Sequence, residues 1–181
     1  MTPNATGELP VLSVVQALTE LSAAGREIKL SATPEERKRL AAAFGVLEIP
    51  ELTATLLLES TRKGARLSGK ITSVVVQACI VTLEPVTQHI AEDIAVGFAP
   101  ADSEPEGHES VEIDPDAPDL PDPIINGIID IGRSVEEYLS LAIDPYPRAR
   151  NAEIPADYRV TKTNPSQSPF SALEALRDDG S

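Results

Sequence analysis

The sequence is poor in cysteine, histidine and aromatic residues. It holds one cysteine, two histidines, no tryptophan, three tyrosines and three phenylalanines among 181 residues. One cysteine excludes an intramolecular disulfide, which fits a reducing compartment, and so few nitrogen and sulfur ligands argue against a structural zinc site. With so few rings, the core must be built from valine, leucine, isoleucine and alanine, which still suffice for one domain.

Long hydrophobic runs are also missing. The longest runs, such as Val74–Val76, are far shorter than the roughly 18 residues that mark a membrane helix. Residues 1–10 lack a basic region followed by an apolar one, so no signal peptide is expected. We therefore expect a cytoplasmic, monomeric protein with no membrane partner.

Basic residues are absent from residues 71–132, where acidic residues are frequent, and the formal net charge of the chain is −14. This acidic span would repel a phosphate backbone and would suit a basic protein instead. Any nucleic-acid contact must therefore use the flanking basic residues. The residues expected to contact nucleic acid or a partner are Arg37, Lys38, Arg39, Arg62, Lys63, Arg66 and Arg148.

A helix start is recognisable at Thr33. Thr33 can cap the free N–H groups of the first turn, Pro34 fits the first helical position, and Glu36 stands where a capping box requires it. Gly45 is suited to end the helix. The pattern predicts a helix up to about Phe44.

Apolar residues at a period of two predict several strands and a sheet. The predicted strands are 11–16, 27–31, 51–60, 66–81 and 88–98, with a hairpin turn at Lys63-Gly64 and a connection at 83–86. The simplest arrangement is an antiparallel meander, or a partly open barrel, packed with two main helices. The predicted fold class is α+β.

The second half of the sequence begins with proline and acidic residues, which predict a long acidic loop over 100–123 that includes a short strand at 110–113. Pro123–Ile129 returns apolar residues to the core. Asp130 can cap a second helix reaching about Ile143, with Ile131, Val135, Leu139 and Ile143 buried and Arg133, Glu136, Glu137 and Ser140 facing water. The predicted organisation is a disordered 1–10, a single domain over 11–148, and a flexible tail over 149–181 with an amphipathic segment at 169–176.

Catalytic and cofactor motifs are not found in the sequence. There is no Gly-x-Ser-x-Gly, no glycine-rich phosphate loop between a strand and a helix, and no dinucleotide fingerprint. Cys79 lies in an apolar run without a basic neighbour, which is typical of an inert buried cysteine at the end of a strand. We expect no catalytic, cofactor or metal site and no enzymatic activity.

Three segments together resemble a known family. They are residues 78–86, 137–148 and 168–176, and the helix start at 33–37 also fits. In this order and spacing the chain resembles the YceD-like family of large ribosomal RNA subunit accumulation proteins, in its alphaproteobacterial form. The residues that mark the resemblance are Cys79, Leu83, Glu84, Pro85, Asp144, Pro145, Tyr146 and Pro147. Val81 and Thr82 stand where the commoner pattern has an arginine and a second cysteine.

The resemblance implies a small bacterial cytoplasmic protein that is not an enzyme. It implies a ribosome-biogenesis factor that supports accumulation of 23S ribosomal RNA by binding that RNA or a large-subunit assembly intermediate. The alternative is an acidic adaptor that holds a basic ribosomal protein without touching RNA.

Overall fold

The computed structural model describes residues 10–22, 24–101 and 120–153. The chain divides into two units, Met1–Ala149 and Arg150–Ser181, and the helices and strands of the described residues lie in the first unit. Most of the predicted disordered start, the acidic residues 102–119 with the predicted strand at 110–113, and the predicted segment at 169–176 lie outside the described residues. None of the helices in the described part is long and apolar enough to cross a membrane.

The first helix, α1 (Pro34–Phe44), begins and ends where its sequence predicts. The Thr33 hydroxyl accepts the Glu36 N–H at 3.3 Å, and the Thr33 N–H donates to Glu36 Oε2 at 2.8 Å. These two bonds satisfy N–H groups at the start of the helix, which have no carbonyl partner within the helix. Gly45 closes the helix at a φ of 67°, in the left-handed region that favours glycine.

Five strands form an open sheet in the order β2-β3-β4-β5-β6, and the described strands do not close into a barrel. Their bounds are β2 (Arg26–Ser31), β3 (Glu48–Thr61), β4 (Gly64–Ala78), β5 (Pro85–Pro100) and β6 (Asp122–Ile124). The first four pair antiparallel with their neighbours in sequence, so the predicted meander is confirmed. The hairpin turn is Arg62-Lys63, one residue earlier than predicted, because Gly64 already pairs with Thr61.

Two parts of the topology differ from a simple meander. Strand β6 runs parallel to β5, with Phe98 opposite Asp122, where the sequence predicted only a return of apolar residues. The short strand β1 (Val15–Ala17), which precedes the 3-10 turn η1 (Leu18–Glu20), pairs with β7 (Ile128–Asp130) in a separate two-stranded sheet. The early and late ends of the described fold are thereby joined.

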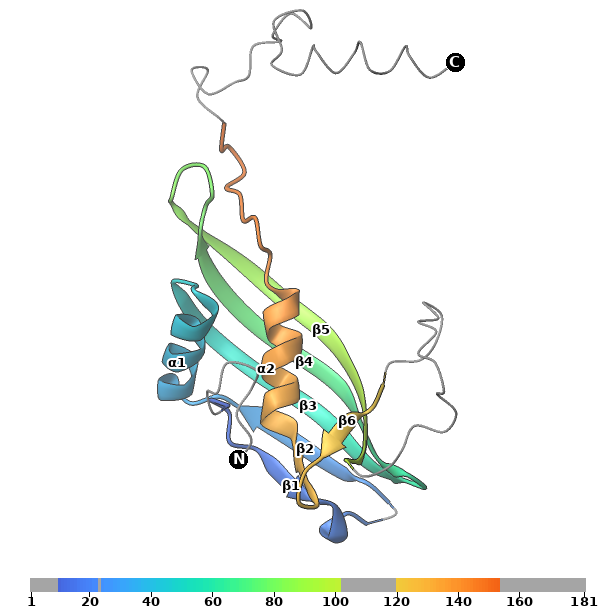
Figure 1. Ribbon diagram of the computed structural model, residues 1–181. Coiled ribbons are helices and arrows are strands. Elements are labelled where there is room, and N and C mark those ends of the chain that lie inside the picture. Colours follow the sequence, from blue (N-terminus) through green and yellow to red (C-terminus); the bar gives the residue numbers. More distant parts are fainter. Residues whose placement is uncertain (1–9, 23, 102–119, 154–181) are drawn as a thin grey trace, which may run out of the picture. The chain divides into compact units, whose positions relative to one another are not determined.

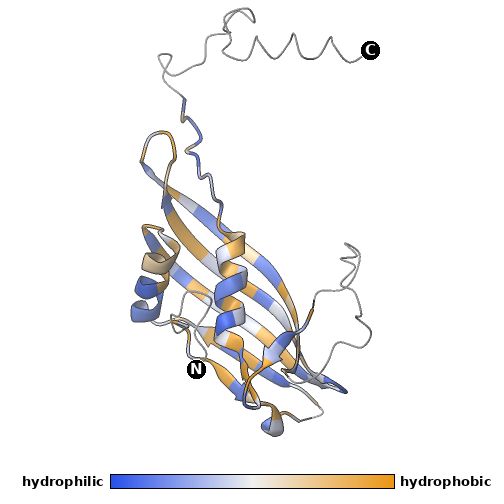
Figure 2. Ribbon diagram, viewed as in Figure 1, coloured by the Kyte–Doolittle hydropathy of each residue, from blue (hydrophilic) through white to orange (hydrophobic). Residues whose placement is uncertain are grey.

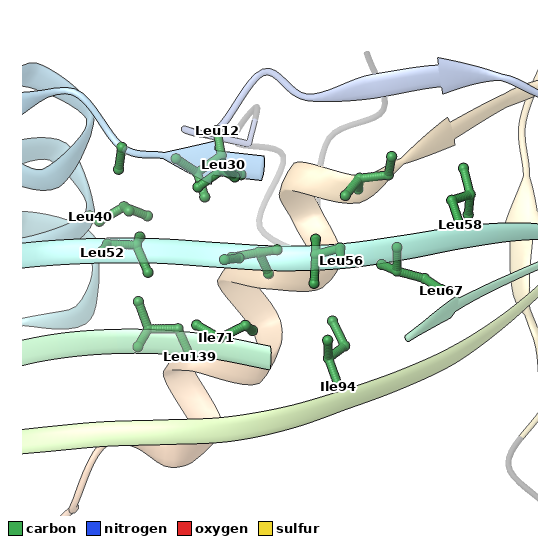
Figure 3. Packing of buried hydrophobic residues seen from close by; sticks show 14 of the residues in the cluster. Leu12, Leu30, Leu40, Leu52, Leu56, Leu58, Leu67, Ile71, Ile94 and Leu139 are labelled. Carbon is green, nitrogen blue, oxygen red and sulfur yellow. The ribbon is translucent and has the colours of Figure 1, made fainter. Parts of the chain in front are cut away.

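The second helix, α2 (Ile131–Ala142), lies across one face of the sheet (Figure 1). Asp130 caps it as predicted, because its carboxylate accepts the Arg133 N–H at 3.0 Å. Hydrophobic and hydrophilic residues alternate along β3, β4 and β5 (Figure 2), so one face of each strand can be buried. The buried side chains of α2 and of the sheet form one aliphatic core (Figure 3), which includes Leu56, Leu67, Ile71, Ile94, Ile131, Val135 and Leu139.

The segment before β1 packs against the start of α2. The N–H groups of Ile131 and Gly132 both donate to the Val14 carbonyl, at 2.9 and 3.0 Å. The Leu12 N–H donates to Glu136 Oε1 at 2.5 Å. The expectation that Glu136 faces water is therefore wrong: it is half-buried, and burial raises the pKa of its carboxyl group against the opposing effect of the Leu12 N–H.

Candidate functional site

Two segments far apart in the sequence meet beyond the end of α2. We call them the junction: the turn 79–84 between β4 and β5, and the segment 144–149. The Ile80 N–H donates to the Pro147 carbonyl at 2.9 Å, and Gln77 Nε2 donates to the Asp144 carbonyl at 2.8 Å. These residues belong to two of the three segments that carry the family resemblance, so the structure brings the marker residues of both together.

Gln88 fastens the second segment to the sheet. Its Nε2 donates to the Ala142 carbonyl at 2.9 Å, and its Oε1 accepts the Asp144 N–H at 3.0 Å. The last carbonyls of a helix lack hydrogen-bond donors within the helix, and Gln88 provides a donor for one of them. This bond fixes where the chain leaves α2. The path of residues 144–149 is thus set by side chains of β4 and β5.

Cys79 lies in the turn rather than in the strand, because β4 ends at Ala78 and not at Val81 as predicted. Its side chain is completely buried, and its sulfur accepts N–H groups of Val81, Thr82 and Ala149, each at 3.4 Å. The Ala149 N–H, followed by the Thr82 hydroxyl and N–H, lowers the pKa of the thiol from 9.0 to about 6, although burial opposes this change. Burial is as predicted, but the acidic thiol was missed, because the strongest donor is 70 residues away in the chain.

The acidity of Cys79 predicts a pH-dependent stability. Its pKa is lower in the folded protein than in the unfolded chain, so its stabilising contribution is complete above about pH 9 and is lost as the pH falls through about 6. We expect the difference in urea midpoint between the wild type and Cys79→Ala to widen from pH 6 to pH 9. A difference in urea midpoint that stays constant from pH 6 to pH 9 would contradict a lowered pKa of Cys79 in the folded protein.

The junction exposes apolar side chains and one cation. The exposed fractions of Leu83, Tyr146 and Ile80 are 76%, 72% and 47%, and Arg148 is also exposed. Leu83 has a φ of 62°, which is unusual for a residue other than glycine and costs about 1–3 kcal/mol. The turn keeps this conformation through the bond from the Leu83 N–H to the Cys79 carbonyl, at 2.9 Å.

The basic residues Arg37, Lys38 and Arg39 lie on α1, which connects to β3 at the same end of the sheet as the junction. The connection from α1 to β3 is placed there by the Leu47 N–H, which donates to the Val76 carbonyl at 2.8 Å. Arg37 and Lys38 line a groove of about 480 Å³ between α1 and the start of β3. Arg37 also donates to the Ala32 carbonyl at 2.7 Å, so part of its guanidinium serves the fold.

The second basic group, Arg62, Lys63 and Arg66, lies at the opposite end of the sheet. Gly64, which follows the hairpin, and Val76 are separated by about 40 Å along β4, at roughly 3.3 Å per residue. Arg66 also faces away from α2, because its neighbours Ala65 and Leu67 are the buried ones. The structure therefore does not unite the predicted basic residues into one surface.

An acidic cavity lies at the start of α2. It has a volume of about 170 Å³ and is lined by Phe98, Asp122, Asp130, Arg133 and Glu137, among others. Arg133 donates to Glu137 at 2.9 Å. Burial, and after it the charge of Glu137, raises the pKa of Asp122, whereas the charge of Arg133 lowers it. Across the described ranges, no group of three or more histidine, cysteine, aspartate or glutamate residues is arranged to hold a metal ion.

Comparison with known proteins gives one match. A model of the family described as "Large ribosomal RNA subunit accumulation protein YceD" matches residues 67–177. A search of curated proteins and a search of solved structures each found no match. The matched region covers more than half of the chain and includes the whole junction. The chain therefore belongs to the YceD family of large ribosomal RNA subunit accumulation proteins.

Proposed function

We propose that this protein is a non-enzymatic, monomeric assembly factor of the bacterial cytoplasm that supports accumulation of 23S ribosomal RNA. In this proposal it binds that RNA, or a large-subunit assembly intermediate, directly. Family membership supports the link to large-subunit RNA. The observation that carries the proposal is the junction, where both marker segments meet at an exposed surface beside Arg148 and at the α1 end of the sheet.

The charge of the protein restricts how such binding works. A net charge of −14 repels RNA at long range, so affinity must come from short-range contacts with local basic residues. Lys38 and Arg39 are exposed on α1, at the junction end, whereas Arg62 and Arg66 are exposed at the far end. We therefore assign the RNA contact to the α1 end.

Sedimentation of tagged full-length protein with large-subunit precursors at low salt tests this proposal. We expect enrichment of large-subunit RNA above background, reduced several-fold by the double variant Lys38→Gln/Arg39→Gln. The matched variant Arg62→Gln/Arg66→Gln removes the same charge at the other end and should change recovery by less than about twofold, since exposed charges beyond a Debye length act weakly. Failure of the wild type to enrich ribosomal RNA would contradict direct binding.

A second candidate function is an adaptor for a basic ribosomal protein. It is favoured by the acidic cavity, where Asp122, Asp130 and Glu137 face a single cation, Arg133. A lysine or arginine side chain of a partner would relieve the unfavourable burial of Asp122. The double variant Asp122→Asn/Glu137→Gln removes two carboxylates of this cavity and separates the two functions. Loss of protein partners with unchanged RNA binding favours the adaptor, and the reverse result contradicts it.

A further inference from the structure

We infer that Tyr146 and Arg148 form a contact for single-stranded RNA, in which the tyrosine ring stacks on an unpaired base and the guanidinium pairs with a phosphate. This inference rests on the proposed function and names the kind of RNA that the junction takes. Tyr146 is the only aromatic residue among the exposed large hydrophobic side chains of the described part. An exposed ring of this kind is the usual stacking platform for single strands.

The two side chains are close together in the segment. Tyr146 and Arg148 are both exposed, whereas Pro147 between them is buried. Both side chains are therefore open to a ligand, only two residues apart. Within the described ranges, Arg148 makes no ion pair or hydrogen bond, so its guanidinium is available for a phosphate.

The segment is held in place before any ligand binds. The Tyr146 N–H donates to Asp144 Oδ1 at 2.9 Å, and Pro147 accepts from the Ile80 N–H. The prolines at 145 and 147 restrict the backbone on both sides of the ring. Because the backbone that carries the ring and the cation is already ordered, it loses little conformational entropy on binding, which favours affinity.

The acidic groups nearby limit the contact to a short stretch of RNA. Asp144 is bonded to the Tyr146 N–H, and Glu84 on the opposing turn accepts the Thr82 hydroxyl at 3.2 Å. These two carboxylates repel additional phosphates. We therefore expect a contact of one or two nucleotides, with a salt dependence far shallower than that of a broadly basic protein.

A duplex would fit the surface less well than a single strand, and a protein partner would use additional residues. Bases in a duplex are stacked on one another, so they offer no free face to Tyr146. A protein partner would be expected to bury the neighbouring Leu83 and Ile80 as well, because apolar contacts dominate the centres of protein interfaces. Substitutions at these two residues therefore separate the RNA contact from a protein contact.

Fluorescence anisotropy of the full-length protein with a labelled 12-nucleotide single-stranded RNA, and with a duplex of the same length, tests the inference. We expect Tyr146→Ala to weaken single-strand binding about 5- to 150-fold, the loss of one base stack, and Tyr146→Phe to change it by less than about twofold. Arg148→Gln should reduce the slope of log affinity against log salt by about 0.7, for one lost phosphate contact. Leu141→Ala, at a residue that is 83% exposed on α2, is the matched surface control.

The outcomes are distinguishable. Co-sedimentation of the wild type with large-subunit precursors, together with unchanged single-strand affinity in Tyr146→Ala, overturns the inference and leaves the proposed function standing. Loss of co-sedimentation in Leu83→Ser/Ile80→Ser with unchanged RNA affinity in Tyr146→Ala identifies a protein contact and also overturns it. A wild type that neither binds the oligonucleotide nor co-sediments contradicts both. Far-ultraviolet circular dichroism of each variant checks that the fold is kept.

Discussion

Replacing Gly132 with alanine is expected to destabilise the protein by about 3 kcal/mol or more, through steric overlap with backbone atoms. A Cβ atom at this position would overlap the Leu12 carbonyl oxygen and lie 2.8 Å from its carbonyl carbon. The neighbouring backbone cannot move away freely, because the Leu12 N–H is bonded to Glu136 and the Val14 carbonyl accepts two N–H groups of α2. The helix propensity gained by alanine, at most about 1 kcal/mol, is too small to compensate.

Urea unfolding of Gly132→Ala beside Gly45→Ala measures this effect. A Cβ atom added at Gly45 would meet no atom within 4 Å, and the φ of this residue is 67°. Alanine there meets only backbone strain, which costs about 1 kcal/mol. Equal losses of stability in the two variants would show that the approach of Leu12 to α2 is not as close as the structure indicates.

Shortening Leu139 to alanine is expected to lower the free energy of unfolding by about 2–5 kcal/mol. Leu139 is completely buried between α2 and the sheet, in the aliphatic core shown in Figure 3. The truncation loses the burial of the leucine side chain and leaves a cavity that the strands cannot easily fill, because β3, β4 and β5 are held by long antiparallel ladders. The measurement is the urea midpoint at constant pH.

Leu141→Ala is the control for this prediction, since it removes the same atoms from the same helix. Leu141 is 83% exposed, so its truncation should change stability by no more than about 0.5 kcal/mol. A loss at residue 141 comparable to that at residue 139 would mean that the outer side of α2 is covered in solution, and that the burial described for this helix is incomplete.

Local structure was predictable wherever its cause lies within a few residues. The capping box at Thr33 and Glu36, the cap at Asp130 and the period-two strands all follow from neighbouring side chains, and the structure contains them. The α+β class and the meander follow from the same signals, because sequential strands with short turns pair antiparallel.

Contacts between distant segments were not predictable in this way. The parallel addition of β6, the pairing of β1 with β7 and the bond from Leu12 to Glu136 depend on the tertiary arrangement, since no local pattern encodes them. Helical periodicity alone therefore predicts, wrongly, that Glu136 faces water. One clue existed: it lies one position from the buried Val135, at the border of the apolar stripe.

The sequence indicates the segments of the candidate site but not their contact. The marker segments were identified from their residues, but their meeting depends on the side chains of Gln77 and Gln88, which carry no recognisable motif. The sequence predicts separate basic patches around Lys38 and Arg62, but only the fold shows that they lie at different ends of the sheet. The exposure of Tyr146 had one signal in the sequence, a tyrosine between two prolines just after a helix, where an aromatic side chain is hard to bury.

The bond between Leu12 and Glu136 joins residues 124 positions apart, and it affects the order in which the fold can be completed during synthesis. Strands β2 to β5 can pair as each is made, because every one follows its partner directly in the chain. Residues 10–17 are made before all of these strands, yet their partners in β7 and α2 are made after all of them. At about 5–20 residues per second, the first segment waits roughly 6–25 s for the residues it contacts. The earliest described part of the chain to be synthesised is thus among the last to be ordered.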